Sequence, residues 1–215
     1  MSYTVTEAYH RILEEADKLG SDYFSLPQVL KAFKKETLSF VGARAKEAEI
    51  NQEVTDDIRS LLVPTLLPFI PNPDNALEKM ATLPNNYHTK ISVNVLYTDG
   101  LKARVPTLER HGEHNTNSIS PFKKPDRMYP LIQQFSNYFN VHTGLTANST
   151  VQPSKLILIY IKQPSFGVAQ TDVMVDLPDS VCEYLFAETA NHLRLNTGEP
   201  QASQDFQANQ TFRNK

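Results

Sequence analysis

The sequence predicts an α+β fold, with an N-terminal helical unit, antiparallel β hairpins in the middle, a C-terminal helix and an extended polar tail. Apolar residues first recur at helical spacing, and from about residue 82 they alternate as in a half-buried strand. Leu156 to Ile161 is an uninterrupted apolar run, which favours a strand covered on both faces. We therefore expect this run to lie at the centre of a core.

Size and composition bound the possible classes of protein. A chain of 215 residues with 40% hydrophobic and 21% charged residues suits one compact domain, which we expect over residues 1–200. The net charge of −3 and the scattered cations disfavour a dedicated nucleic-acid binder. The single cysteine, Cys182, excludes an intramolecular disulfide and a thiolate metal cluster. Without a signal peptide or a membrane-length apolar run, we expect a soluble protein with no membrane partner.

Residues 1–73 are predicted to be helical. An apolar stripe that includes Ile12 and Leu13 predicts a helix from Thr6 to Leu19, followed by Gly20 as its C-terminal cap. Ser25 is the expected cap of a second helix that ends near Glu47, and a third helix is expected over residues 52–62. The prolines that follow are expected to end regular structure; they are Pro64, Pro68, Pro71 and Pro73.

Residues 82–177 are predicted to be rich in strands. The turn Thr98-Asp99-Gly100 joins two alternating segments, which predicts a hairpin. A further strand is expected over residues 132–141, after Pro130. Val173, Val175 and Leu177 share one face of a predicted strand that would pair antiparallel with the apolar run at residues 156–161.

The C-terminal helix is predicted over residues 178–195, and residues 201–215 are predicted to form an extended arm. Asp179 near the start of the helix and Arg194 near its end suit the helix dipole. The arm is polar, and its only apolar anchors are Phe206 and Phe212, so it cannot form a core of its own. Two phenylalanines on a polar arm indicate docking on another surface.

Few residues offer catalytic or metal-binding chemistry. His111 and His114 lie on either side of Glu113 and, in a helix, would share a face as metal ligands do. No third His or Cys nearby completes a tetrahedral set, and Asn and Ser dominate the neighbourhood, which favours a solvated polar loop. Cys182 could be a nucleophile, but it lies on the apolar stripe of the last helix, which favours burial. Isolated His88 and His142, and the oxygen-bearing set Asp172, Asp176 and Asp179, favour structural roles. We therefore expect no enzyme, no metal and no cofactor.

Three segments are the candidate interfaces. Lys123, Lys124 and Arg127 form the tight basic cluster, which could contact phosphate or face an acidic partner. Phe166 and Gly167 belong to the loop after the apolar run. Phe206 and Phe212 belong to the arm.

The order of these features resembles a known family. A helical region precedes Leu83-Pro84-Asn85-Asn86-Tyr87 and a hairpin, and a proline-bounded strand follows at Pro125 to Val141. An apolar strand then closes at Pro164, and Asp176-Leu177-Pro178-Asp179 starts the last helix. This order is similar to that of neck proteins of tailed bacteriophages, the head-to-tail connector or adaptor proteins beneath the portal, especially those of crAss-like phages.

The resemblance implies a structural virion protein that forms a ring, commonly of about twelve subunits, and contacts the portal and other neck or tail proteins. Genomic DNA would pass through the channel without sequence-specific binding during ejection. The protein would be made in the cytoplasm of the bacterial host and reside in the virion neck. The family's termini dock on neighbouring subunits or on the portal, which here implies the arm. Three other classes stay open: a generic interaction protein, a metal enzyme or regulator using His88, His111, His114 and Glu113, and a DNA-packaging or host-directed module using Lys123, Lys124 and Arg127.

Overall fold

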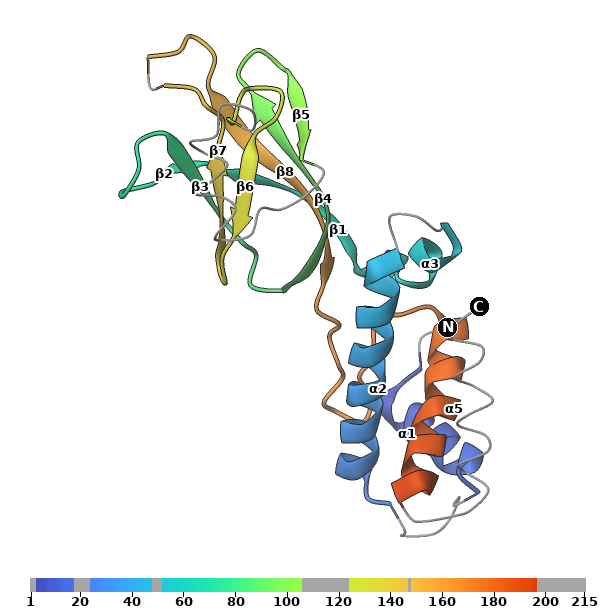
Figure 1. The fold of residues 1–215 in the computed structure, drawn as a ribbon. Coiled ribbons are helices and arrows are strands. Elements are labelled where there is room, and N and C mark those ends of the chain that lie inside the picture. Colours follow the sequence, from blue (N-terminus) through green and yellow to red (C-terminus); the bar gives the residue numbers. More distant parts are fainter. Residues whose placement is uncertain (1–2, 18–23, 48–51, 106–123, 147, 197–215) are drawn as a thin grey trace. The chain divides into compact units, whose positions relative to one another are not determined.

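The computed structural model describes residues 3–17, 24–47, 52–105, 124–146 and 148–196, and its fold is α+β, as predicted (Figure 1). The chain forms two compact units. Unit 1 comprises Met1–Leu61 and Pro164–Lys215, and unit 2 comprises Leu62–Gln163. None of the helices in the described ranges is long and apolar enough to span a bilayer.

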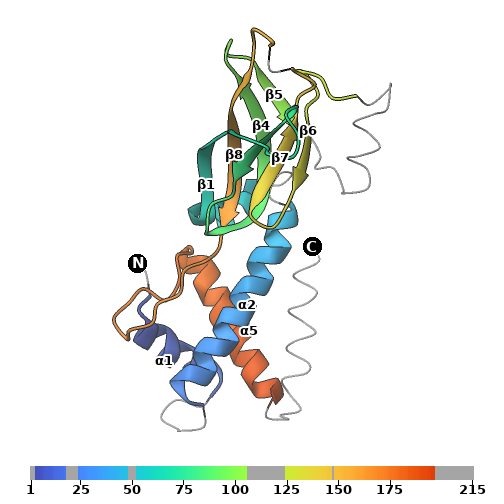
Figure 2. The same cartoon turned by 90° about the vertical axis from the view of Figure 1, so that its left-hand side faces the viewer.

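Unit 1 is helical. It contains α1 (Val5–Glu15), α2 (Leu26–Glu47), α3 (Gln52–Asp57), a short 3-10 turn (Arg59–Leu61) and α5 (Asp179–Asn196). Helices α2 and α5 lie side by side, and α1 packs against both (Figures 1 and 2). Phe33 of α2 and Phe186 of α5 are buried at this contact, with ring centroids 5.7 Å apart. The apolar stripes predicted for these helices therefore form one core.

Local signals set most helix boundaries. Thr4 and Glu7 form a capping box at the start of α1, because the Thr4 side chain accepts from the Glu7 amide and the Glu7 carboxylate accepts from the Thr4 amide. Ser25 precedes α2, which ends at Glu47, as predicted. Helix α1 ends earlier than predicted, because Asp17 adopts a left-handed conformation with φ of 53°. Leu19 and Gly20 lie outside the described residues.

The strand predicted around Val173–Leu177 is wrong. This segment makes only isolated bridges, from Val173 to Thr4 and from Val175 to Phe166. The expected partner, β8 (Pro153–Lys162), is already paired on one side with β1 (Leu62–Pro68) and on the other with β4 (Tyr87–Tyr97). No edge of β8 is left for a third strand, and the segment packs with the helices of unit 1 instead.

Unit 2 consists of two antiparallel four-stranded sheets. One has the order β1-β8-β4-β5, where β5 is Lys102–Val105. The other has the order β2-β3-β7-β6, with β2 at Ile70–Pro71, β3 at Glu78–Thr82, β7 at Tyr138–His142 and β6 at Leu131–Gln134. The β4–β5 hairpin confirms the predicted turn at residues 98–100, where the Gly100 amide donates to the Tyr97 carbonyl at 3.0 Å.

The predicted internal boundaries need two corrections. The helical part does not extend to residue 73, because β1 begins at Leu62 despite Pro64 and Pro68. Strand β1 lies at a sheet edge, where a residue without an N–H group is tolerated. The β-rich part ends at Lys162 and not at residue 177. That residues 1–200 form a single domain stays a prediction, because two compact packing units do not establish separate folding.

The core of unit 2 lies on one face of β8. Leu156, Leu158 and Tyr160 are buried, whereas Ile157 and Ile159 on the opposite face are only half-buried. Ile161, which is on the same face as Ile157 and Ile159, is fully buried. The apolar run is therefore central in its sheet, as predicted, and is covered along the whole of one face but only in part on the other. The strand predicted over residues 132–141 is in fact the hairpin of β6 and β7, because the chain turns where the Phe135 amide donates to the Tyr138 carbonyl at 2.8 Å.

Candidate interaction sites

The loop at residues 124–130 of unit 2 presents two large apolar side chains to solvent. Tyr129 is 72% exposed and Met128 is 53% exposed, and Lys124 beside them is also exposed. Lys123, the first residue of the predicted basic cluster, lies outside the described residues. We refer to residues 124–130 as the presenting loop.

Hydrogen bonds from the loop's own backbone fix its conformation. One carboxylate oxygen of Asp126 accepts from the amide of Met128 at 2.7 Å and from the amide of Tyr129 at 2.8 Å. A side chain that satisfies two successive backbone donors is a local turn motif. The apolar side chains are therefore carried by an ordered turn.

Gly144 allows the presenting loop to pack closely on the rest of unit 2. Its φ is +69°, and a Cβ at this position would lie 2.1 Å from the Pro125 carbonyl oxygen. Since side chains are disfavoured at this φ and no atom fits at this distance, only glycine is compatible with the packing.

Arg127 points back onto unit 2. Its guanidinium pairs with Asp99 in the β4–β5 turn and lies 5.5 Å from the centre of the Tyr97 ring. Burial raises the pKa of Tyr97 to about 12, although the Arg127 charge acts in the opposite direction. Arg127 was predicted as an interface residue, and the structure places it in a contact that anchors the presenting loop. No local sequence pattern indicates the exposure of Met128, because the turn held by Asp126 determines it.

The predicted loop at Phe166 and Gly167 lies in unit 1. Phe166 is half-buried, with its ring centre 6.5 Å from that of Phe33 and 5.4 Å from the Lys34 ammonium. A Cβ on Gly167 would lie 2.5 Å from the Val173 carbonyl oxygen, so the backbones approach too closely for a side chain. Val168, which is 87% exposed, is the apolar residue that this loop presents to solvent.

Asp172 organises the same loop. One of its carboxylate oxygens accepts from the amides of Val168 at 3.1 Å and Ala169 at 2.8 Å. These two backbone donors lower the pKa of Asp172, the Ala169 amide having the larger effect. Its role is therefore structural, as the sequence favoured.

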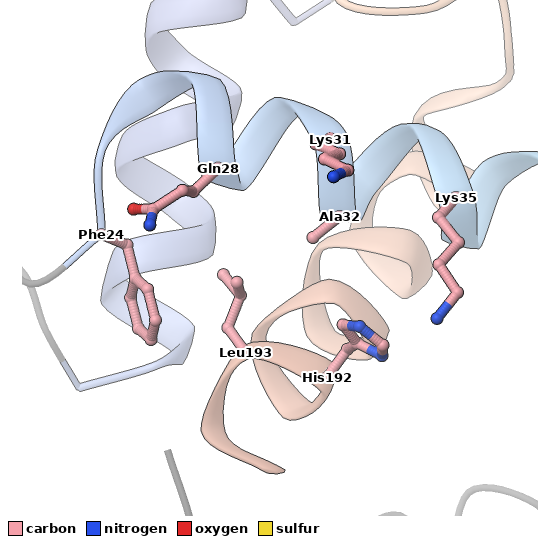
Figure 3. Close-up of a pocket in the computed structure, with 7 residues that line it drawn as sticks. All are labelled: Phe24, Gln28, Lys31, Ala32, Lys35, His192 and Leu193. Atoms are coloured by element: carbon pink, nitrogen blue, oxygen red, sulfur yellow. The ribbon is translucent and has the colours of Figure 1, made fainter. Parts of the chain in front are cut away.

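Two pockets lie on the basic face of α2. The first, of about 540 Å³, lies between α2 and α5 and is shown in Figure 3. Its lining residues are Phe24, Gln28, Lys31, Ala32, Lys35, His192 and Leu193. We call it the α2–α5 pocket. The second, of about 500 Å³, is lined in part by Lys31, Lys34, Phe166 and Val168.

The polar groups of the α2–α5 pocket have defined neighbours. Nδ1 of His192 lies 3.5 Å from Oε1 of Glu36, a largely buried residue of α2. The side-chain oxygen of Gln28 accepts from both the backbone and the hydroxyl of Ser25 at 2.9 Å, which leaves its NH2 group as the donor at the pocket. No sequence motif indicates this pocket, because α2 and α5 are far apart in the chain and meet only through tertiary packing.

The residues considered for metal or nucleophilic chemistry do not form a site in the described part of the chain. His88 is exposed on β4, and no group of three or more His, Cys, Asp or Glu side chains there could hold a metal ion. Cys182 is buried, which raises the pKa of its thiol to about 11 and favours the unreactive protonated form. His111, Glu113, His114, Phe206 and Phe212 lie outside the described residues.

No protein-family model matches the sequence, and no curated protein matches it.

Proposed function

We propose that this chain is a structural protein of the tailed-bacteriophage neck, where it forms a ring that joins the portal to the tail and continues the DNA channel. The observation that carries the proposal is the presenting loop, an anchored turn with exposed Met128 and Tyr129. The resemblance of the sequence features to those of phage neck proteins is the reason for assigning this surface to a neck interface.

The chemistry of the presenting loop suits a protein interface. Tyrosine and methionine are enriched at such interfaces, and tyrosine is a frequent hot-spot residue. Because Asp126 and Gly144 already hold the backbone, little conformational entropy is lost when a partner binds. A partner surface with an apolar pocket could therefore take up Tyr129 at low cost.

A ring places particular demands on its subunits. Each subunit must offer two different surfaces, so that the contact repeats head to tail and closes. The net charge of −3 suits a channel for DNA, because a surface with few clustered cations releases few counterions and binds DNA weakly. The proposed location is the virion neck, after synthesis in the cytoplasm of the bacterial host.

Mutation of the presenting loop tests the proposal. The purified protein is mixed with the portal protein of the same phage, and the assembled mass is measured by mass photometry. We expect Tyr129→Ala to weaken assembly by about tenfold or more, as loss of a hot-spot side chain does. Leu77→Ala is the matched control, since Leu77 is a 44% exposed apolar residue of the same unit outside this loop.

The outcomes separate the possible functions. Assembly that survives Tyr129→Ala unchanged would remove the presenting loop from the interface. A tight complex of defined small stoichiometry, without closure, would favour the generic interaction protein. Salt-dependent binding to duplex DNA in place of the portal would favour a DNA-packaging module.

A further inference from the structure

The α2–α5 pocket combines an apolar floor with a cationic rim. Phe24, Ala32 and Leu193 are each less than 10% exposed and form the floor. Lys31 and Lys35 lie on the rim, one turn apart on α2, and the Gln28 amide adds a donor (Figure 3). No carboxylate is among the described residues that line it. The acidic group in contact with a lining residue is Glu36 of α2, whose Oε1 lies 3.5 Å from Nδ1 of His192.

This lining favours one class of ligand. The floor accepts an apolar group that is withdrawn from water, and the two ammonium groups favour an anion directly beside it. An aromatic side chain next to a carboxylate meets both requirements.

The polar arm of the chain contains one such pair. Asp205 immediately precedes Phe206, whereas Phe212 is followed by the cation Arg213, which the lysines would repel. We propose that Asp205 and Phe206 dock in the α2–α5 pocket of their own chain, with the Phe206 ring on the floor and the Asp205 carboxylate beside Lys31 and Lys35.

The connection between arm and pocket supports docking within one chain. His192 and Leu193 lie near the C-terminal end of α5, which ends at Asn196. Asp205 follows nine residues later, a length of chain that spans up to about 30 Å when extended. Such a short tether gives a millimolar effective concentration, which exceeds that of a second copy under ordinary conditions. This inference does not depend on the proposed ring.

Disulfide trapping in the full-length protein tests the contact. Gln28→Cys, a pocket position whose replacement leaves both lysines in place, is combined with Gln204→Cys next to Asp205, and the oxidised protein is analysed on non-reducing gels and by peptide mapping. The matched control combines Gln204→Cys with Lys46→Cys, since Lys46 is an exposed lysine farther along α2. The native Cys182 is buried and is retained in both variants. We expect a disulfide within one chain that forms at least about tenfold faster than in the control.

Three further substitutions in the trapping variant distinguish specific docking from random collisions of the arm with the pocket. Phe206→Ala should slow trapping by about tenfold, as loss of an apolar anchor does, while Phe212→Ala should leave the rate unchanged. Asp205→Asn should slow trapping most at low salt, because its contact is electrostatic.

Three results would overturn the proposal. Trapping no faster than in the Lys46 control would show that the arm does not occupy the pocket. Crosslinked dimers at micromolar protein would assign the arm to a second copy. Equal effects of Phe206→Ala and Phe212→Ala would remove the Asp205–Phe206 pair as the recognised element.

Discussion

Unit 1 and unit 2 are built from the chain in different ways. Unit 2 is continuous in sequence, and its sheets come from successive hairpins and the central strand β8. Unit 1 joins the two ends of the chain: the Val5 amide donates to the Asp172 carbonyl at 2.9 Å, and the Met174 amide donates to the Tyr3 carbonyl at 2.8 Å. Closing such contacts across long loops costs entropy, which burial between α1, α2 and α5 must offset.

The two units also differ in the shape of the surface that each offers to a partner. In unit 1 the α2–α5 pocket is the proposed site of the chain's own arm, and the second pocket, lined in part by Lys34 and Phe166, leaves a concave candidate surface for another subunit. In unit 2 the presenting loop projects Met128 and Tyr129, so its candidate surface is convex. A subunit with one surface of each kind suits association through two unlike patches.

The largest expected effect comes from the core of unit 1. Phe33→Ala removes a fully buried ring of α2 and should lower the free energy of unfolding by about 3–5 kcal/mol. If the two units unfold independently, amide hydrogen exchange in Phe33→Ala should accelerate in α1, α2 and α5 and stay unchanged in β4 and β8. The converse variant Leu158→Ala should act on unit 2. Uniform loss of protection in both units after either change would make them one cooperative unit.

Gly144→Ala should disturb the presenting loop of unit 2. The new methyl group would overlap the Pro125 carbonyl, so we expect a loss of about 2 kcal/mol or more in denaturant unfolding. Gly100→Ala is the control, since its φ is also positive, +86°, but no atom lies within 4 Å of the new Cβ. Equal losses in the two variants would mean that the close approach to Pro125 contributes nothing.

The start of α1 should respond to both mutation and acid. Thr4→Ala removes the capping box and should cost about 1 kcal/mol, measured by denaturant unfolding of unit 1. The Thr4 amide and hydroxyl lower the pKa of Glu7 from its ordinary 4.5. Since the folded form favours the carboxylate, this contribution is present above about pH 4.5 and is lost as the pH falls through the lower folded pKa.

The contribution of Glu7 is isolated by measuring the free energy of unfolding of the wild type and of Thr4→Ala at several acidic pH values. The difference in unfolding free energy between wild type and Thr4→Ala should shrink as the pH falls below 4.5, the ordinary pKa of Glu7. A difference that stays constant into strong acid would show that Glu7 takes no part in the cap.

The smallest effect is expected from Arg127. Its pair with Asp99 is partly exposed and its contact with Tyr97 is a single cation–π contact, so Arg127→Ala should cost about 1 kcal/mol or less. Arg59→Ala, whose pair with Asp56 is 4.0 Å long and more exposed, should have no measurable effect. Faster exchange of the Met128 and Tyr129 amides in Arg127→Ala alone would establish the anchoring role; an effect of equal size in Arg59→Ala would contradict it.

Local sequence signals predicted the local structure well. The apolar stripes and caps located α2 and α5, and the alternation around Asp99 and Gly100 located the β4–β5 hairpin. Strand β1 was missed because Pro64 and Pro68 oppose strand formation everywhere except at an edge, and edge position is a property of the whole sheet.

The candidate sites depended more on tertiary structure. Lys31 and His192 are brought to one pocket by the packing of α2 on α5, which no short motif encodes. The basic neighbours of Arg127 in sequence predict an interface residue, which stays a prediction, but they do not indicate its pair with Asp99 in a distant hairpin turn. The residues that surround Lys31, His192 and Arg127 in the folded protein, and not their neighbours in sequence, therefore determine their contacts.

Direct observation of assembly tests the central proposal. The purified full-length protein is mixed with its portal and examined by mass photometry and electron microscopy. The proposed neck function predicts closed rings coaxial with the portal, with an added mass of about twelve copies of the 24.3 kDa chain. A chain that stays monomeric and unbound at micromolar concentration would contradict it.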